Sequence, residues 1–259
     1  MFQFRAITAT GVLGLALAST AGHTFAADGK LTGSTGIDYT TGSYGEAIDT
    51  SIVYIPFTGK YETGPWLFSL TLPYIRVSGP GGVVRDVGSV GTAGTARRTE
   101  SGMGDIVGTA TYNYCWDPQR QLAIDFTGKL KLATANERKN LGTGEEDLHV
   151  QVDAYQSRGR WTPFGTLGYK FLGDPPGVDL RDVFYASAGA TYRLDDERIV
   201  GAMWYGQQKT TARGSAQSEI TGFYSRKLDA DWRGQFYGLL GLSDGSPDVG
   251  LGFVATRQF

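Results

Sequence analysis

The sequence contains very little cysteine and histidine. Cys115 is the one cysteine among 259 residues, so the chain cannot form an internal disulfide. The two histidines, His23 and His149, and the scattered acidic residues match no metal-ligand spacing, and we expect neither a metal nor a cofactor. Lys and Arg number 24 against 26 Asp and Glu, a net charge of −2. This balance gives no reason to expect a nucleic-acid partner.

Long hydrophobic runs are also absent. The apolar stretch at residues 6–18 is shorter than the roughly 18 residues that a membrane-spanning helix needs, and no later run approaches that length. This excludes a helical membrane protein. Arg5 before the stretch and Thr24-Phe25-Ala26 after it are typical of a secretory signal peptide. We therefore expect a signal peptide at residues 1–26, cleaved after Ala26, and one domain at residues 27–259.

Alternation of apolar and polar residues is the dominant pattern in the rest of the chain. In residues 120–133, for example, Ile124 and Phe126 share one face while Asp125 and Lys129 share the other. A period of two predicts β-strands with one dry and one polar face. The sequence predicts twelve strands, at 31–41, 48–60, 65–76, 104–116, 120–133, 146–157, 160–172, 182–194, 197–208, 217–228, 231–243 and 247–259.

The connections between these strands alternate in length. Short turns lie at 62–64, 117–119, 157–159, 195–196 and 229–230, and longer links lie at 42–47, 77–103, 134–145, 173–181 and 209–216. Short turns on one rim and long loops on the other are typical of bacterial outer-membrane barrels. We therefore predict an all-β protein, a transmembrane antiparallel up-and-down β-barrel of about 12 strands. An even strand number places both termini in the periplasm.

Aromatic residues at the predicted strand ends support the membrane topology. Trp66, Trp116, Trp161 and Trp232 each lie beside a short turn, and Phe259 ends the chain. Indole rings favour the interface between lipid and water, so we expect these five residues to form a membrane-interface girdle against outer-membrane lipid. The terminal Phe resembles the signal that the barrel assembly machinery reads during biogenesis. A soluble β-sandwich is the structural alternative, and it explains neither the interfacial Trp residues nor the alternating loop lengths.

The inward face of the predicted barrel collects charged and aromatic side chains. We expect twelve of them to line a narrow pore: Asp125, Lys129, Lys131, His149, Asp153, Tyr155, Lys170, Tyr185, Arg193, Lys227, Arg233 and Tyr237. Lys129 and Asp153 are the pair that we expect to interact. Residues 77–103 are expected to form a mobile extracellular loop, with folding into the pore as the alternative.

His149 allows a different hypothesis. It shares a face with Asp147 and Asp153 at spacings of two and four, and such a set could act as a general base in a barrel hydrolase. We prefer to interpret His149 as a polar residue of a wet lumen and expect no enzymatic activity. A plugged barrel with a structural role is the third possibility.

Three stretches carry a resemblance to a known family: Glu100-Ser-Gly-Met-Gly-Asp105-Ile, Lys129-Leu-Lys-Leu-Ala-Thr134 followed by Leu141-Gly-Thr-Gly144 and Asp147, and Pro163-Phe-Gly with Gly168-Tyr-Lys. In order and spacing the chain resembles the MetA-like outer-membrane proteins of meta-pathway phenol degradation, although Ala133 replaces an expected Pro. The resemblance implies an outer-membrane channel for passive or selective passage of small molecules, often aromatic or hydrophobic. It supplies no catalytic residues.

Overall fold

The computed structural model describes residues 29–259 apart from residues 91–93 and 95. For Trp116 it describes the backbone but not the side chain. The predicted signal peptide at residues 1–26 therefore lies outside the described residues. In the described part, no helix is long and apolar enough to cross a membrane.

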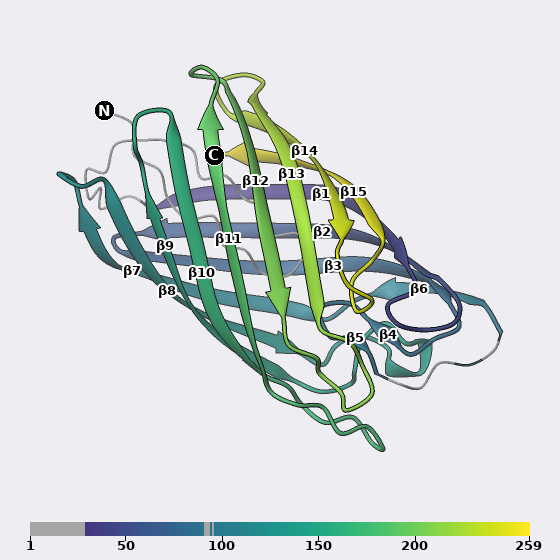
Figure 1. Ribbon diagram of the computed structural model, residues 1–259. Helices are drawn as coiled ribbons and strands as arrows, with labels where there is room; N and C mark the ends of the chain where they lie inside the picture. Colours follow the sequence, from purple (N-terminus) through teal and green to yellow (C-terminus); the bar gives the residue numbers. More distant parts are fainter. Residues whose placement is uncertain (1–28, 91–93, 95) are drawn as a thin grey trace.

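Twelve long strands form one closed ring (Figure 1). Each pairs antiparallel with its neighbours, and β1 closes the ring by pairing with β15, with Tyr39 opposite Leu251. Closure gives each of these twelve strands a partner on both sides, which is the condition for a sheet to reside in lipid. The predicted fold class is confirmed. The strands are β1 (Lys30–Gly42), β2 (Thr50–Thr63), β3 (Trp66–Gly79), β7 (Ile106–Asp117), β8 (Leu122–Leu132), β9 (Asp147–Gln156), β10 (Trp161–Phe171), β11 (Val183–Arg193), β12 (Arg198–Gln207), β13 (Gln217–Lys227), β14 (Trp232–Gly241) and β15 (Val249–Gln258).

Shorter elements lie between β3 and β7 and between β8 and β9. β6 (Arg98–Met103) pairs with the end of β3 and extends the wall beyond β7, from which it is separated by Gly104 and Asp105. β4 (Val83–Val84) and β5 (Gly88–Ser89) form a small hairpin, and the 3-10 helix η1 (Glu137–Lys139) lies in the link after β8. The predicted loop at 77–103 is thus too long, because its two ends belong to the barrel wall.

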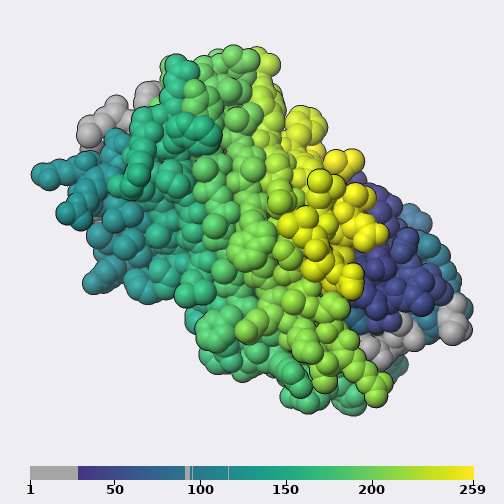
Figure 2. Space-filling view, in the orientation of Figure 1, coloured from purple at the N-terminus to yellow at the C-terminus, as the bar shows by residue number. Residues whose placement is uncertain are grey.

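The two faces of the wall have opposite chemistry. Outward residues such as Leu167, Phe236 and Leu251 are 60–68% exposed, whereas inward residues such as Asp125 and Lys170 are 2% exposed. This is the reverse of a water-soluble protein, and it is the pattern expected for a sheet surrounded by hydrocarbon. Figure 2 shows the outer wall as a continuous surface, in which the yellow C-terminal segment lies directly against the purple N-terminal one.

The connections divide between the two ends of the barrel. The short turns β2–β3, β7–β8, β9–β10, β11–β12 and β13–β14 gather at one end, which we call the short-turn end. The long loops and β4–β6 gather at the other, the long-loop end (Figure 1). The last residue also lies at the short-turn end, where the Phe259 N–H donates to the carbonyl oxygen of Leu31 at 2.9 Å.

Inward-facing glycines allow aromatic rings to lie flat against the wall. Gly168 on β10 is paired with Tyr185 on β11, and Gly252 on β15 is paired with Tyr237 on β14. A Cβ atom at Gly168 or Gly252 would meet the neighbouring tyrosine ring at 2.2 or 2.1 Å. Only a residue without a side chain fits such a position, so the rings occupy space that the glycines leave open.

Gly168→Ala is therefore expected to destabilise the barrel by about 1–3 kcal/mol, the usual cost of overpacking. The added methyl must displace the Tyr185 ring and break its hydroxyl's 2.7 Å hydrogen bond to Gln151 Oε1. Urea unfolding in detergent measures the effect. Gly128→Ala is the control, because a Cβ atom there has no neighbour within 4 Å. Equal stability of the two variants would show that the ring does not depend on the glycine.

Candidate functional site

Three basic side chains form a row across the inner wall. The strand register sets Lys129 on β8 opposite His149 on β9, and His149 opposite Lys170 on β10. All three are buried inside the barrel, with exposures of 7% or less. We call these residues the cationic row. Their inward direction follows from their parity along strands whose other face is apolar.

Residues 83–90, which we call the inner loop, fold into the long-loop end of the barrel. Val83 packs in a cluster with Ile52 and Leu141 from the wall and its loops. Val84, Val87 and Val90 pack on the other side with apolar residues of β11 and of the link that precedes it, namely Leu172, Val178, Leu180 and Val183. For this segment the expectation of a mobile loop is therefore wrong and the alternative, folding into the pore, is confirmed, because burial of four valines holds the loop inside.

Two adjacent charged residues attach the inner loop to opposite walls. The Arg85 guanidinium forms a 2.8 Å ion pair with Asp38 on β1, and the Tyr237 hydroxyl donates to the other Asp38 oxygen at 2.7 Å. On the other side, Lys170 Nζ donates to the Asp86 carbonyl oxygen at 3.1 Å. β10 is the sixth strand from β1 in either direction around the ring. The inner loop therefore crosses the whole lumen.

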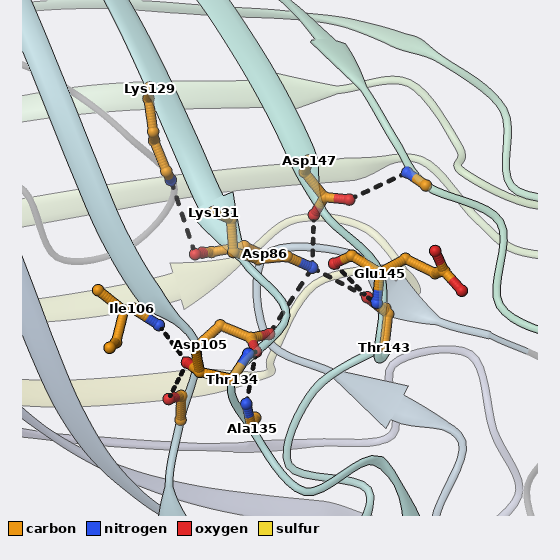
Figure 3. A network of polar contacts seen from close by, with 12 residues as sticks. Asp86, Asp105, Ile106, Lys129, Lys131, Thr134, Ala135, Thr143, Glu145 and Asp147 are labelled. Carbon is orange, nitrogen blue, oxygen red and sulfur yellow. Dashed lines mark hydrogen bonds and ion pairs between the residues drawn. The ribbon is translucent and has the colours of Figure 1, made fainter.

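The Asp86 carboxylate itself faces the cationic row. Lys129 Nζ lies 3.9 Å from Asp86 Oδ2 (Figure 3). Burial by itself raises the pKa of Asp86, but the nearby Lys129, Arg85 and Lys170 cations outweigh it and lower the pKa below its ordinary value of 3.8. Burial likewise opposes the charge of Arg85, and Asp38 and Asp86 raise its pKa overall. Both groups are therefore charged at neutral pH.

A second network, centred on Lys131, closes the wall beside the inner loop (Figure 3). Lys131 Nζ lies 2.7 Å from Asp147 and 3.7 Å from Asp105, and it donates to the Thr143 hydroxyl at 2.9 Å. Asp105 in turn accepts the backbone N–H groups of Thr134 and Ala135 at 3.0 and 2.9 Å. Burial raises the pKa of Asp105 although these donors and Lys131 oppose the shift. We call this the Lys131 hub, and residues of the first two family-like stretches meet in it.

Nearer the short-turn end the lumen is filled by a hydrogen-bonded layer. Tyr155 donates to Asp125 at 3.1 Å, and Gln151 and Thr166 both donate to Asp153. The predicted pair of Lys129 with Asp153 is wrong. The register sets Asp153 opposite Asp125, four residues along the strand from Lys129, and Asp86 of the inner loop is the carboxylate that faces Lys129.

The remaining predicted pore residues lie in two places. Tyr185 and Tyr237 are buried on the inner wall, at 2% and 8% exposure. Arg193, Lys227 and Arg233 lie near the short-turn end, where Lys227 is exposed and the other two are half-buried. These three cations are therefore separate from the cationic row.

The predicted girdle residues lie at the short-turn end. Trp66, Trp161 and Trp232 are 39–54% exposed and Phe259 is 67% exposed. The side chain of Trp116, on β7, lies outside the described residues. Two tyrosines that sequence reasoning missed join the girdle: Tyr112 lies 4.8 Å from Trp66 and Tyr192 lies 4.8 Å from Trp161, measured between ring centroids. The strand register could have identified them, because each tyrosine is directly opposite its Trp on the neighbouring strand.

The hydrolase hypothesis finds no support in the geometry of His149. Neither ring nitrogen has a hydrogen-bond partner among the described residues. Asp147 is bound by Lys131, and Asp153 is bound by Gln151 and Thr166. In hydrolase triads a third group orients the general base by a hydrogen bond, and none of the described residues does so for His149. Within residues 29–259 outside the gaps, no group of three His, Cys, Asp or Glu side chains could hold a metal ion.

Comparison with known proteins places this barrel in a family. The family model described as "Putative MetA-pathway of phenol degradation" matches residues 19–232. The chain belongs to this family. No curated protein matches it in sequence.

Two solved structures share the architecture of this chain. The COG4313 outer membrane channel from Pseudomonas putida F1 is 16% identical with a TM-score of 0.69, covering 92% of this chain and 99% of that one. The NanC porin is 11% identical with a TM-score of 0.52, covering 87% of this chain and 98% of that one. At these identities the likeness is one of fold.

Proposed function

We propose that the protein is an outer-membrane channel through which small molecules pass, and that the structure represents its closed form. The observation that carries the proposal is a closed ring of strands with a charged interior, crossed at one mouth by a single loop that side-chain contacts hold in place. Membership of the phenol-degradation family and the fold shared with an outer membrane channel support it.

The interior favours small solutes that combine a ring with a polar group. Twelve strands enclose a narrower space than the 16 to 18 of general porins. Inside it, a buried cluster lies next to the cationic row on the side of the short-turn end. The cluster contains Tyr155, Phe164, Tyr185, Met203 and Tyr205. The pore-lining residues predicted from the sequence are the groups that we expect such a solute to meet, and we expect no chemical conversion of it.

We place the short-turn end in the periplasm. Outer-membrane barrels have short periplasmic turns and long extracellular loops, and the girdle of Trp, Tyr and Phe marks the same end as an interface with lipid headgroups. Both termini of the barrel are then periplasmic. The inner loop, at the opposite end, closes the extracellular mouth.

The purified protein is expected to give small, discrete conductance steps in a planar lipid bilayer, with heat-denatured protein as the control. A strain lacking the gene is expected to take up small aromatic compounds more slowly than a complemented strain. Absence of both conductance and an uptake phenotype would contradict the channel.

The plugged barrel with a structural role is the second candidate, because the inner loop does cross the mouth. The two candidates differ in whether loosening that loop produces a pathway. If the protein is a channel, removing the Arg85 contact increases its conductance. If it is a structural plug, the hydrogen-bonded layer of Asp125, Asp153 and their partners still blocks the lumen, and no conductance appears.

A further inference from the structure

At and beside the cationic row, buried nitrogen atoms lack hydrogen-bond partners among the described residues. Both ring nitrogens of His149 and the side-chain nitrogen of Gln207 are buried without a partner. Gln207 lies next to the row, since its side-chain oxygen accepts from Lys170 Nζ and from the Tyr205 hydroxyl. Unpartnered buried polar groups are costly. A neutral imidazole supplies one N–H donor and the Gln207 amide supplies two, so donors remain without acceptors beside the two ammonium groups, and this indicates a site for an anionic acceptor.

The Asp86 side chain occupies this site only loosely. Its carboxylate is 3.9 Å from Lys129 Nζ, beyond hydrogen-bonding distance, and is 31% exposed. The loop therefore presents to the row a carboxylate that is not hydrogen-bonded to Lys129.

An aromatic surface lies directly beside the row. Lys170 Nζ is 5.3 Å from the centre of the Tyr185 ring, and the rings of His149 and Tyr185 are 6.4 Å apart. Tyr205 extends this surface, with its ring centroid 6.2 Å from that of Tyr185. A planar ring whose acidic group met Lys129 and Lys170 would thus lie against aromatic faces.

We propose that the cationic row binds the carboxylate of a small aromatic acid, which takes the place of the Asp86 side chain. The inference rests on the proposed channel function and names a solute class for it. Asp86 acts as an internal competitor, because a carboxylate tethered to the loop has a high effective concentration at the row. Binding of the solute therefore favours release of the inner loop from this wall.

Benzoate is the probe, tested against the purified full-length chain in detergent by isothermal titration calorimetry. Asp86→Asn removes the competitor, and we expect it to tighten benzoate binding by about tenfold, because a carboxylate tethered at high effective concentration no longer competes for the row. The double variant Asp86→Asn with Lys170→Met is expected to weaken binding by about tenfold or more relative to Asp86→Asn, since a hydrogen bond to a charged group is lost. Asp196→Asn, in an exposed turn, is the charge-matched control and should bind as the wild type does.

Two ligands separate the parts of the proposal. Benzyl alcohol has the ring without the charge, and acetate has the charge without the ring. If either binds the wild type as tightly as benzoate, or if Asp86→Asn leaves benzoate affinity unchanged, the proposal is overturned. If Asp86→Asn loses strand content by circular dichroism, the test is made on the wild type alone. The wild type must then bind benzoate at least about tenfold more tightly than it binds benzyl alcohol or acetate.

Failure of this site and failure of the channel give different results. Discrete conductance with no dependence of benzoate binding on Asp86 and Lys170 would overturn the site and leave the channel in place. If benzoate binds as expected to the wild type and the variants but the protein never conducts, the binding site is established and the channel function is contradicted.

Discussion

Arg85→Ala is expected to open the mouth of the barrel and to raise the single-channel conductance several-fold. Asp38 is fully buried, with an exposure of 0%, and the Arg85 guanidinium is the cation that neutralises it. Removing one partner of a buried ion pair costs about 3–5 kcal/mol, because the remaining charge is left without compensation. Withdrawal of the inner loop relieves this cost by letting water reach Asp38.

Arg97→Ala is the matched control for this experiment. Arg97 belongs to the same connection between β3 and β7, but it is exposed and its hydrogen bonds to Ser78 and Ser51 are 3.4–3.5 Å long. We expect its conductance to equal that of the wild type. Equal conductance of Arg85→Ala and Arg97→Ala, with strand content intact by circular dichroism, would show that the ion pair does not hold the loop.

The pKa of Asp86 sets the pH window of the experiment. Because the docked loop lowers this pKa below 3.8, the stabilisation from Asp86 is fully present above that value and is lost only as the pH falls through the lowered pKa. Recordings between pH 5 and pH 7 therefore leave Asp86 charged, so that a difference between the variants there reports Arg85.

The barrel was predictable from the sequence because lipid imposes a period of two on every strand. A residue such as Phe126 must face hydrocarbon if Asp125 faces the lumen, and the alternation fixes the strand and both of its faces together. The same rule placed Lys129, His149 and Lys170 on the inner wall. Their alignment into one row needed the register of three strands, which the turn lengths alone do not determine.

The inner loop was not predictable in this way. Residues 83–87, Val-Val-Arg-Asp-Val, lie in a connection rich in glycine, and no periodicity specifies where such a segment docks. Its place is set by tertiary contacts with Asp38, Lys170 and the apolar clusters at both walls. A signal was present in retrospect, since two opposite charges flanked by valines are unusual in a solvated loop. Asp38 and Asp105 were missed because their partners come from that loop and from the Lys131 hub.

Lys131→Met is expected to lower the free energy of unfolding by about 3–5 kcal/mol, the range for removing one partner of a buried ion pair. Asp147 is 2% exposed, and without Lys131 its one remaining donor in the described part of the chain is the Gly173 N–H at 3.1 Å. The substitution also removes the donor to Thr143, so we expect hydrogen exchange to accelerate over residues 134–146 while the short-turn end stays protected.

Lys139→Met separates this effect from a general loss of positive charge. Lys139 forms a 3.9 Å ion pair with Glu100 at the same end of the barrel, but both side chains are more than 40% exposed. Exposed pairs contribute about 0–1 kcal/mol, so urea unfolding in detergent should distinguish the two lysines clearly. Lys131→Met combined with Asp147→Asn should recover part of the loss, because no unpaired charge is then buried. If Lys131→Met were no more destabilising than Lys139→Met, the hub would not hold the long-loop end together, and the inner loop would have to be anchored by its valines and Arg85 alone.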